Sequence, residues 1–146
     1  MAQQTPQTFE NHVRMLPAYH YVAIPLIALN FFVTLYQAVV HFSWANLMAF
    51  GLAVALVLLS LLVRVMAITV QDRVIRLEET LRMRALLPAD LQPRIGEFSV
   101  KQLVALRFAG DDELPDLARK VLEEKIVDQK AIKQAVRHWR ADYLRV

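Results

Sequence analysis

The chain has 146 residues, 56% of them hydrophobic, a mean hydropathy of +0.32 and a formal net charge of +3. It contains no Cys, which excludes disulfides and thiolate chemistry. The small net charge, with acidic residues interspersed among the basic ones, argues against a nucleic-acid partner. The composition is more apolar than that of an ordinary soluble domain, as membrane spans require.

The first twenty residues are mostly polar, and we expect residues 1–20 to form a cytoplasmic or interfacial segment. They do not resemble a cleavable signal peptide, which has a short apolar region directly behind a basic start. Arg14 comes just before the first apolar run. We therefore expect Arg14 to contact lipid head groups.

The apolar stretch that follows, residues 15–63, carries no Lys, Arg, Asp or Glu. A membrane-spanning helix needs about 20 apolar residues, so this stretch is long enough for two. A polar segment, residues 41–46, divides it. The sequence therefore predicts a transmembrane hairpin over residues 21–63, with spans at about 21–40 and 45–63.

Within the first span, four polar residues share one helical face at i, i+4, i+7 and i+11: Asn30, Thr34, Gln37 and His41. Polar groups left unpaired against lipid cost several kcal/mol, so this stripe should face the second span, another copy or water. The plainer interpretation is hydrogen bonding between helices, worth ~0.6 kcal/mol per contact on average. The alternative is the polar lining of a pore.

Basic residues are distributed unevenly around the two spans. The turn between the spans has no Lys or Arg, whereas five Arg follow the second span: Arg64, Arg73, Arg76, Arg82 and Arg84. The positive-inside rule then places residues 64–146 in the cytoplasm, and two spans return the N-terminus to the same side. Arg64, at the end of the span, is expected at the lipid head groups.

Beyond the second span the helical pattern continues, because no Gly or Pro occurs between Leu52 and Leu87. We predict a cytoplasmic stalk helix over residues 64–87. Apolar residues recur along it in alternating steps of four and three: Val63, Ala67, Val70, Val74, Leu77 and Leu81. This spacing is typical of a coiled-coil seam and favours self-association. The alternative is packing against the terminal helices of the same chain.

After the stalk, residues 88–98 are predicted to be a linker because they contain two prolines. A region of three short helices is expected over residues 99–146. Ser99 with Gln102 resembles a capping box at the start of the first helix. Asp111 or Asp112 can cap the second helix.

Asp128 can cap the third helix, which is expected to present an apolar face that includes Trp139 and Tyr143. Basic residues lie along one side of the same predicted helix and form a candidate docking face: Lys130, Lys133, Arg137, Trp139 and Arg140. Such a face can contact lipid or an unidentified protein partner, or it can simply be solvated.

No catalytic, cofactor or metal site is predicted. The four His residues share no ligand spacing on one helix: His12, His20, His41 and His138. The chain has no glycine-rich phosphate loop and no nucleophile elbow. We therefore expect a protein that is not an enzyme.

Two segments flank the spans in a pattern that resembles a known family. One is QTFENHVR at 7–14, and the other runs from LRFA at 106–109 through DELP at 112–115 to IK at 132–133, WR at 139–140 and DY at 142–143. The chain is similar to a family of two-span bacterial membrane proteins without an established activity, some of which are automatically labelled transporter permeases. The resemblance implies a location in the bacterial inner membrane and assigns no functional residues.

These observations together predict an all-α membrane protein with both termini in the cytoplasm. The expected role is that of a non-enzymatic, homo-oligomeric inner-membrane scaffold or partner-docking protein. The first alternative is a small pore or transport subunit lined by the polar stripe of the first span. The second alternative is an organiser of the lipid surface.

Overall fold

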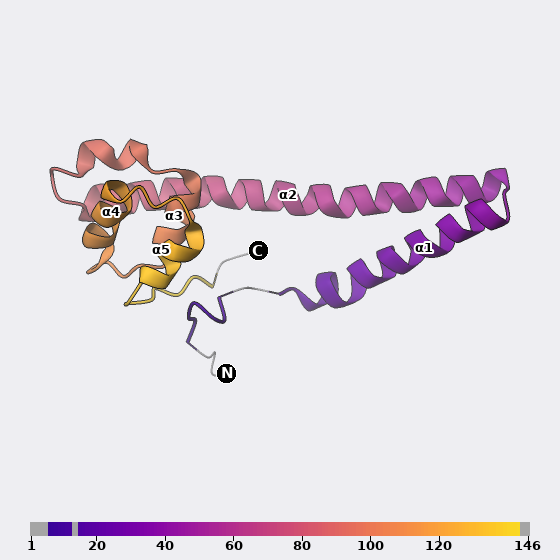
Figure 1. Cartoon of the computed structure of the whole chain (residues 1–146), viewed down its shortest axis with the longest axis horizontal. Coiled ribbons are helices and arrows are strands. Elements are labelled where there is room, and N and C mark those ends of the chain that lie inside the picture. The colour runs from indigo at the N-terminus through magenta and orange to yellow at the C-terminus, as the bar shows by residue number, and fades with distance from the viewer. Residues whose placement is uncertain (1–5, 13–14, 144–146) are drawn as a thin grey trace. The chain divides into compact units, whose positions relative to one another are not determined.

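A computed structural model of the chain describes residues 6–12 and 15–143. Within these residues the regular structure is helical, and one isolated bridge pairs Ala109 with Trp139. The chain divides into two compact units (Figure 1). One contains residues 15–68, and the other combines the described part of residues 1–14 with that of residues 69–146.

The unit of residues 15–68 is built from apolar helices. A π-helical segment, η1 (Ala18–Ala23), leads into α1 (Ile24–Val40), and α2 (Trp44–Leu86) begins after a short turn. Pro25 lies in the first turn of α1, where a missing N–H costs little. The helical stretches Ala18–Val40 and Trp44–Leu86 are each long and apolar enough to cross a membrane.

Contacts within this unit join the first helical stretch to α2. The Tyr19 hydroxyl donates to the Ser60 carbonyl at 3.1 Å, and the rings of Phe31 and Phe50 lie with centroids 5.5 Å apart. Ala53 is fully buried. Most large apolar side chains of the unit remain exposed, among them Leu26, Leu29, Phe32, Leu52, Leu58 and Leu61. Apolar surface of this extent needs a non-aqueous surrounding or a partner.

The other unit has a small hydrophobic core formed by short helices. Its elements are η2 (Gln92–Glu97, a 3-10 helix), α3 (Val100–Leu106), α4 (Leu114–Glu123) and α5 (Gln129–Ala135), packed with the last turns of α2. Its hydrophobic core includes Met83, Leu87, Leu91, Ile95, Phe98, Leu103, Leu106, Leu114, Val121 and Ile132.

Residues 88–98 differ from the predicted linker. Leu91, Ile95 and Phe98 are buried in the core, and η2 occupies most of the segment. Pro93 lies at the start of η2, where its fixed φ suits a helical turn. The apolar spacing of these three side chains outweighs the two prolines, so the segment is part of the packed unit.

The predicted helix caps have different outcomes. The capping box is confirmed, because the Ser99 side chain accepts from Gln102 N and the Gln102 side chain accepts from Ser99 N. Asp128 caps α5 through the N–H groups of Lys130 and Ala131, each at 3.1 Å. The cap predicted for the second helix is wrong, since Glu113 occupies that position without a side-chain cap bond.

The last helix is shorter than predicted. α5 ends at Ala135, so Trp139 and Tyr143 do not extend its apolar face. The chain instead runs back along the end of α3: Gly110 N donates to His138 O at 2.8 Å and Arg140 N to Phe108 O at 2.7 Å. These tertiary bonds satisfy the backbone that a longer helix would have paired internally.

The N-terminal segment packs against the C-terminal one rather than standing alone. The Gln7 amide donates to Asp142 O at 3.0 Å and accepts from Asp142 N at 2.8 Å. The His12 ring lies 5.8 Å from Trp139 and 5.6 Å from Phe108, centroid to centroid. Residues 6–12 therefore belong to the same unit as residues 69–143.

Candidate functional site

The C-terminal part of α2, residues 69–86, has two opposite faces in different environments. On one face, Ile75, Met83 and Leu87 are buried in the core of their unit. On the other face lie four of the predicted seam residues, whose side chains are exposed: Val70 by 62%, Val74 by 48%, Leu77 by 62% and Leu81 by 57%. One face is therefore occupied within the chain, and the seam is not.

The alternative prediction was that the seam packs against the terminal helices of its own chain. These four side chains are exposed and do not pack there. The hydrophobic core formed with these helices contains Met83 and Leu87 of the opposite face instead. The two remaining predicted seam residues lie in the other unit, where Val63 is exposed and Ala67 is partly exposed.

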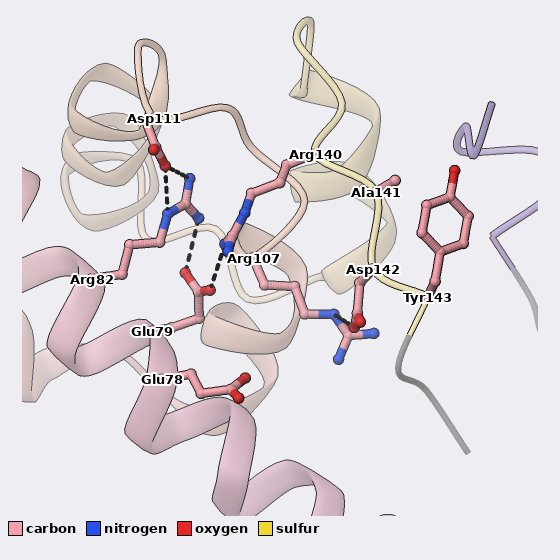
Figure 2. Close-up of a pocket in the computed structure, with 9 residues that line it drawn as sticks. All are labelled: Glu78, Glu79, Arg82, Arg107, Asp111, Arg140, Ala141, Asp142 and Tyr143. Atoms are coloured by element: carbon pink, nitrogen blue, oxygen red, sulfur yellow. Dashed lines mark hydrogen bonds and ion pairs between the residues drawn. The ribbon is translucent and has the colours of Figure 1, made fainter.

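A buried carboxylate lies on the occupied face, between Ile75 and Met83. Glu79 accepts from Arg82 at 3.0 Å and from Arg140 at 3.4 Å, and its side chain is almost fully enclosed (Figure 2). Burial raises the pKa of Glu79, because it penalises the charged form, and the neighbouring Arg82 partly opposes this shift.

Arg82 connects α2 to the loop between α3 and α4. It reaches Asp111 through two nitrogens, at 2.8 and 2.6 Å, and donates to the Ala109 carbonyl at 2.6 Å. Asp111 therefore binds Arg82 rather than capping α4. Charge-assisted bonds of this kind fix the geometry of both segments.

A second cationic side chain, Arg107, is buried beside the C-terminal segment. Its guanidinium lies 4.5 Å from the Phe108 ring centroid and 3.4 Å from an Asp142 oxygen. The Trp139 ring stacks on the Phe108 ring, with the two ring centroids 4.5 Å apart. Cation–π and ring contacts thus hold the C-terminal segment on α3.

These charged groups surround a cavity of about 710 Å³ that is open to solvent. Figure 2 shows the nine residues that line it: Glu78, Glu79, Arg82, Arg107, Asp111, Arg140, Ala141, Asp142 and Tyr143. Apart from Glu78, the carboxylates and guanidinium groups of the lining pair with one another, and the lining contains no Ser, His or Cys. These ion pairs join the C-terminal part of α2 to the loop after α3 and to the C-terminal segment.

The predicted polar stripe of the first span is not brought together as one lining. Thr34 is buried, and its hydroxyl donates to the Asn30 carbonyl one turn earlier, at 2.7 Å. Asn30, Gln37 and His41 are exposed, and the Gln37 carbonyl accepts from the Asn46 amide at 3.4 Å.

The predicted docking face does not lie on one helix. Lys130 and Lys133 are on α5, whereas Arg137, Trp139 and Arg140 follow its end. Lys133 Nζ lies 3.2 Å from His12 Nε2 and 5.4 Å from the Phe108 ring centroid, so it packs within the unit. Lys130 and Arg137 are exposed.

The remaining predicted residues are the two Arg expected at lipid head groups. Arg64 is partly exposed on α2. Arg14 lies outside the described residues. Across the described ranges, no group of three or more His, Cys, Asp or Glu could hold a metal ion.

Sequence reasoning missed Glu79, Arg107 and the packing of the N-terminal segment. A signal for Glu79 was present, because Ile75, Glu79 and Met83 follow one another at steps of four and continue to Leu87. That second stripe marks a core-facing side of the helix. A charged residue within such a stripe indicates a buried ion pair.

Over the described residues, the chain is an all-helical protein with two helices long and apolar enough to cross a membrane and a compact unit of short helices. The chain belongs to the family of unknown function DUF6526, which matches it over residues 1–146. No curated protein matches it, and no solved structure does.

Proposed function

We propose that this protein is a non-enzymatic, homo-oligomeric membrane scaffold. Its apolar helices anchor it, the seam of α2 joins copies, and its compact helical unit offers a docking surface to a protein partner. The observation that carries the proposal is the exposure of Val70, Val74, Leu77 and Leu81 on a helix whose opposite face is already packed. A contiguous apolar row with coiled-coil spacing is stabilised when it is covered by a partner helix.

The proposed location is the bacterial inner membrane, with both termini in the cytoplasm. The Arg residues that follow the second apolar stretch support this orientation. The hydrogen bonds from Gln7 to Asp142 support the placement of both termini on one side, because they join a segment before the first apolar helix to one after the second. Two crossings are needed to return the chain to one side.

The test is the mass of the native complex extracted with its surrounding lipid. We expect a multimer for the natural protein and its dissociation in the Val74→Asp, Leu77→Asp double variant, because buried charge at an apolar seam is costly. Val127→Asp is the matched control, since Val127 is exposed outside the seam. A natural protein that is a monomer, or a double variant with unchanged mass, contradicts the proposal.

A pore lined by Asn30, Thr34 and Gln37 is the alternative with less support. The Thr34 hydroxyl is already bonded to the backbone of its own helix, which leaves Asn30 and Gln37 as exposed polar groups on α1. The alternative predicts solute flux in liposomes that changes with Asn30→Leu. Absence of flux across small ions and neutral solutes counts against it.

An organiser of the lipid surface is the second alternative, and the exposed cations Lys130 and Arg137 are what favour it. It predicts that anionic lipid is retained on the full-length protein in native mass spectra and is lost in a Lys130→Glu, Arg137→Glu variant. Equal lipid retention by the two proteins would remove this alternative.

A further inference from the structure

The spacing of the seam residues assigns them to heptad positions. Val70 and Leu77 fall at d, and Val74 and Leu81 fall at a. Ile75, Glu79 and Met83 then fall at b, f and c, which are the positions that point away from the partner in a coiled coil. These are the residues that are buried within the chain's own unit. The intrachain packing and a helix partner therefore use different faces of α2.

Two charged residues flank the seam, one on each side. Arg73 falls at g and Glu78 at e, and both are exposed. They are five residues apart, so they point about 140° away from each other on one helix and cannot pair there. Within the described structure neither forms an ion pair, although Arg82 and Glu79 close by both do.

In a parallel coiled coil, the g residue of one helix faces the e residue of the next heptad on the other helix, five positions further along. Arg73 of one copy then meets Glu78 of the other, and the symmetric pair forms on the opposite flank. An antiparallel arrangement places g opposite g and e opposite e, which brings like charges together. The charge pattern therefore favours a parallel partner with the same sequence.

We infer that the seam of α2 binds the same seam of a second copy in parallel and in register, with Arg73 of each copy paired to Glu78 of the other. The inference rests on the proposed self-association and specifies its partner, orientation and register. The seam from Val70 to Leu81 is short for an isolated coiled coil. Apolar helices that hold the copies in one membrane raise their effective concentration, which makes a short seam sufficient.

The test is charge reversal with rescue in the full-length protein in lipid. Arg73→Glu alone and Glu78→Arg alone each place like charges across the seam and should weaken association roughly tenfold. The double variant R73E/E78R restores opposite charges and should recover most of that loss. The association is measured as the multimer fraction against the protein-to-lipid ratio. A double variant no stronger than the single variants would overturn the inference.

Arg76→Glu is the matched control, because Arg76 carries the same charge at an outward position and forms no ion pair within the described structure. We expect it to leave association within about twofold of the natural protein, as exposed charges away from an interface contribute little. An effect equal to that of Arg73→Glu would mean that net charge, not the pairing, controls association, and this too would overturn the inference.

Cysteine cross-linking separates this inference from the proposed function, because the natural chain has no Cys. Leu77→Cys should form a disulfide-linked dimer under mild oxidation, since equivalent d positions approach closely enough in a parallel pair. Arg76→Cys should not. A multimer that dissociates in the Val74→Asp, Leu77→Asp variant but does not link at Leu77→Cys refutes the parallel, in-register pairing and leaves the scaffold proposal standing. A monomer at every protein-to-lipid ratio removes both.

Discussion

Trp139 stacks on the buried ring of Phe108, with ring centroids 4.5 Å apart and ring planes 18° from parallel. Phe108 follows the end of α3, and Trp139 lies in the extended segment after α5, so the stack joins these two parts of the unit. The same Trp139 indole donates to the Gln7 amide oxygen at 3.4 Å. The Trp139 side chain thus contacts both the N-terminal segment and the residue that follows α3.

Replacing Trp139 should destabilise the unit of residues 69–143. Trp139→Ala removes the stack and uncovers Phe108, and we expect a loss of about 2 kcal/mol in the free energy of unfolding, because a large ring contact is lost at a half-buried site. Denaturant unfolding followed by circular dichroism measures it. The chain has a second Trp that serves as the control: Trp44 is 76% exposed, and Trp44→Ala should leave that transition unchanged. Equal changes in the free energy of unfolding for the two variants would contradict the stabilising role of the Trp139–Phe108 stack.

The buried carboxylate of Glu79 should make stability depend on pH in a particular direction. Its folded-state pKa is raised above an ordinary value of 4.5, mainly by burial. The contribution of such a group is fully present below its unfolded pKa and is lost as pH rises through the higher folded value. We therefore expect the free energy of unfolding of the natural protein, measured relative to Glu79→Gln, to fall as pH rises from about 4.5.

Glu97 provides a control of opposite sign for the Glu79 experiment. It is exposed and pairs with Arg94 at 3.0 Å, which lowers the pKa of Glu97. Its contribution is present above the unfolded pKa and lost as pH falls through the lower folded value. The free energy of unfolding of the natural protein, measured relative to Glu97→Gln, should therefore rise with pH, or stay flat where solvent screens the ion pair. If the free energy of unfolding relative to Glu79→Gln instead rises with pH, the ion pairs of Glu79 lower its pKa more than burial raises it.

Gly110 should tolerate no side chain, because the C-terminal segment passes directly over it. A Cβ built at Gly110 would lie 3.1 Å from the His138 carbonyl oxygen, 3.1 Å from His138 Cβ and 2.5 Å from an Asp112 oxygen. The Asp112 side chain can rotate away, but the His138 backbone is held by the Gly110 N–H bond at 2.8 Å. Gly110→Ala should cost about 1–2 kcal/mol by thermal or denaturant unfolding.

Gly96→Ala is the natural comparison for Gly110→Ala. A Cβ at Gly96 meets nothing within 4 Å, and the backbone there has no positive φ. We expect that variant to be neutral or slightly more stable, because Ala restricts the unfolded chain. A cost at Gly96 as large as that at Gly110 would mean that the contact with His138 is not what Gly110 protects.

The sequence alone determined the features that depend on local pattern. The charge-free stretch of residues 15–63 marked both membrane-length helices, and the Ser99–Gln102 and Asp128 caps marked the starts of α3 and α5. Apolar periodicity, capping chemistry and helix breakers act over a few residues, so a single chain reveals them without its fold. The seam of α2 was visible for the same reason.

Only the tertiary structure decided which segments distant in sequence meet. It buried Leu91, Ile95 and Phe98 where two prolines suggested a linker, ended α5 at Ala135, and directed Asp111 to Arg82 rather than to a helix cap. In each case, core burial or a long-range polar bond outweighed a local preference worth about 0.5–3 kcal/mol. It also left the seam of α2 uncovered, because the compact unit packs on the stripe that contains Glu79, Met83 and Leu87, and a helix can bury only one side against a given core.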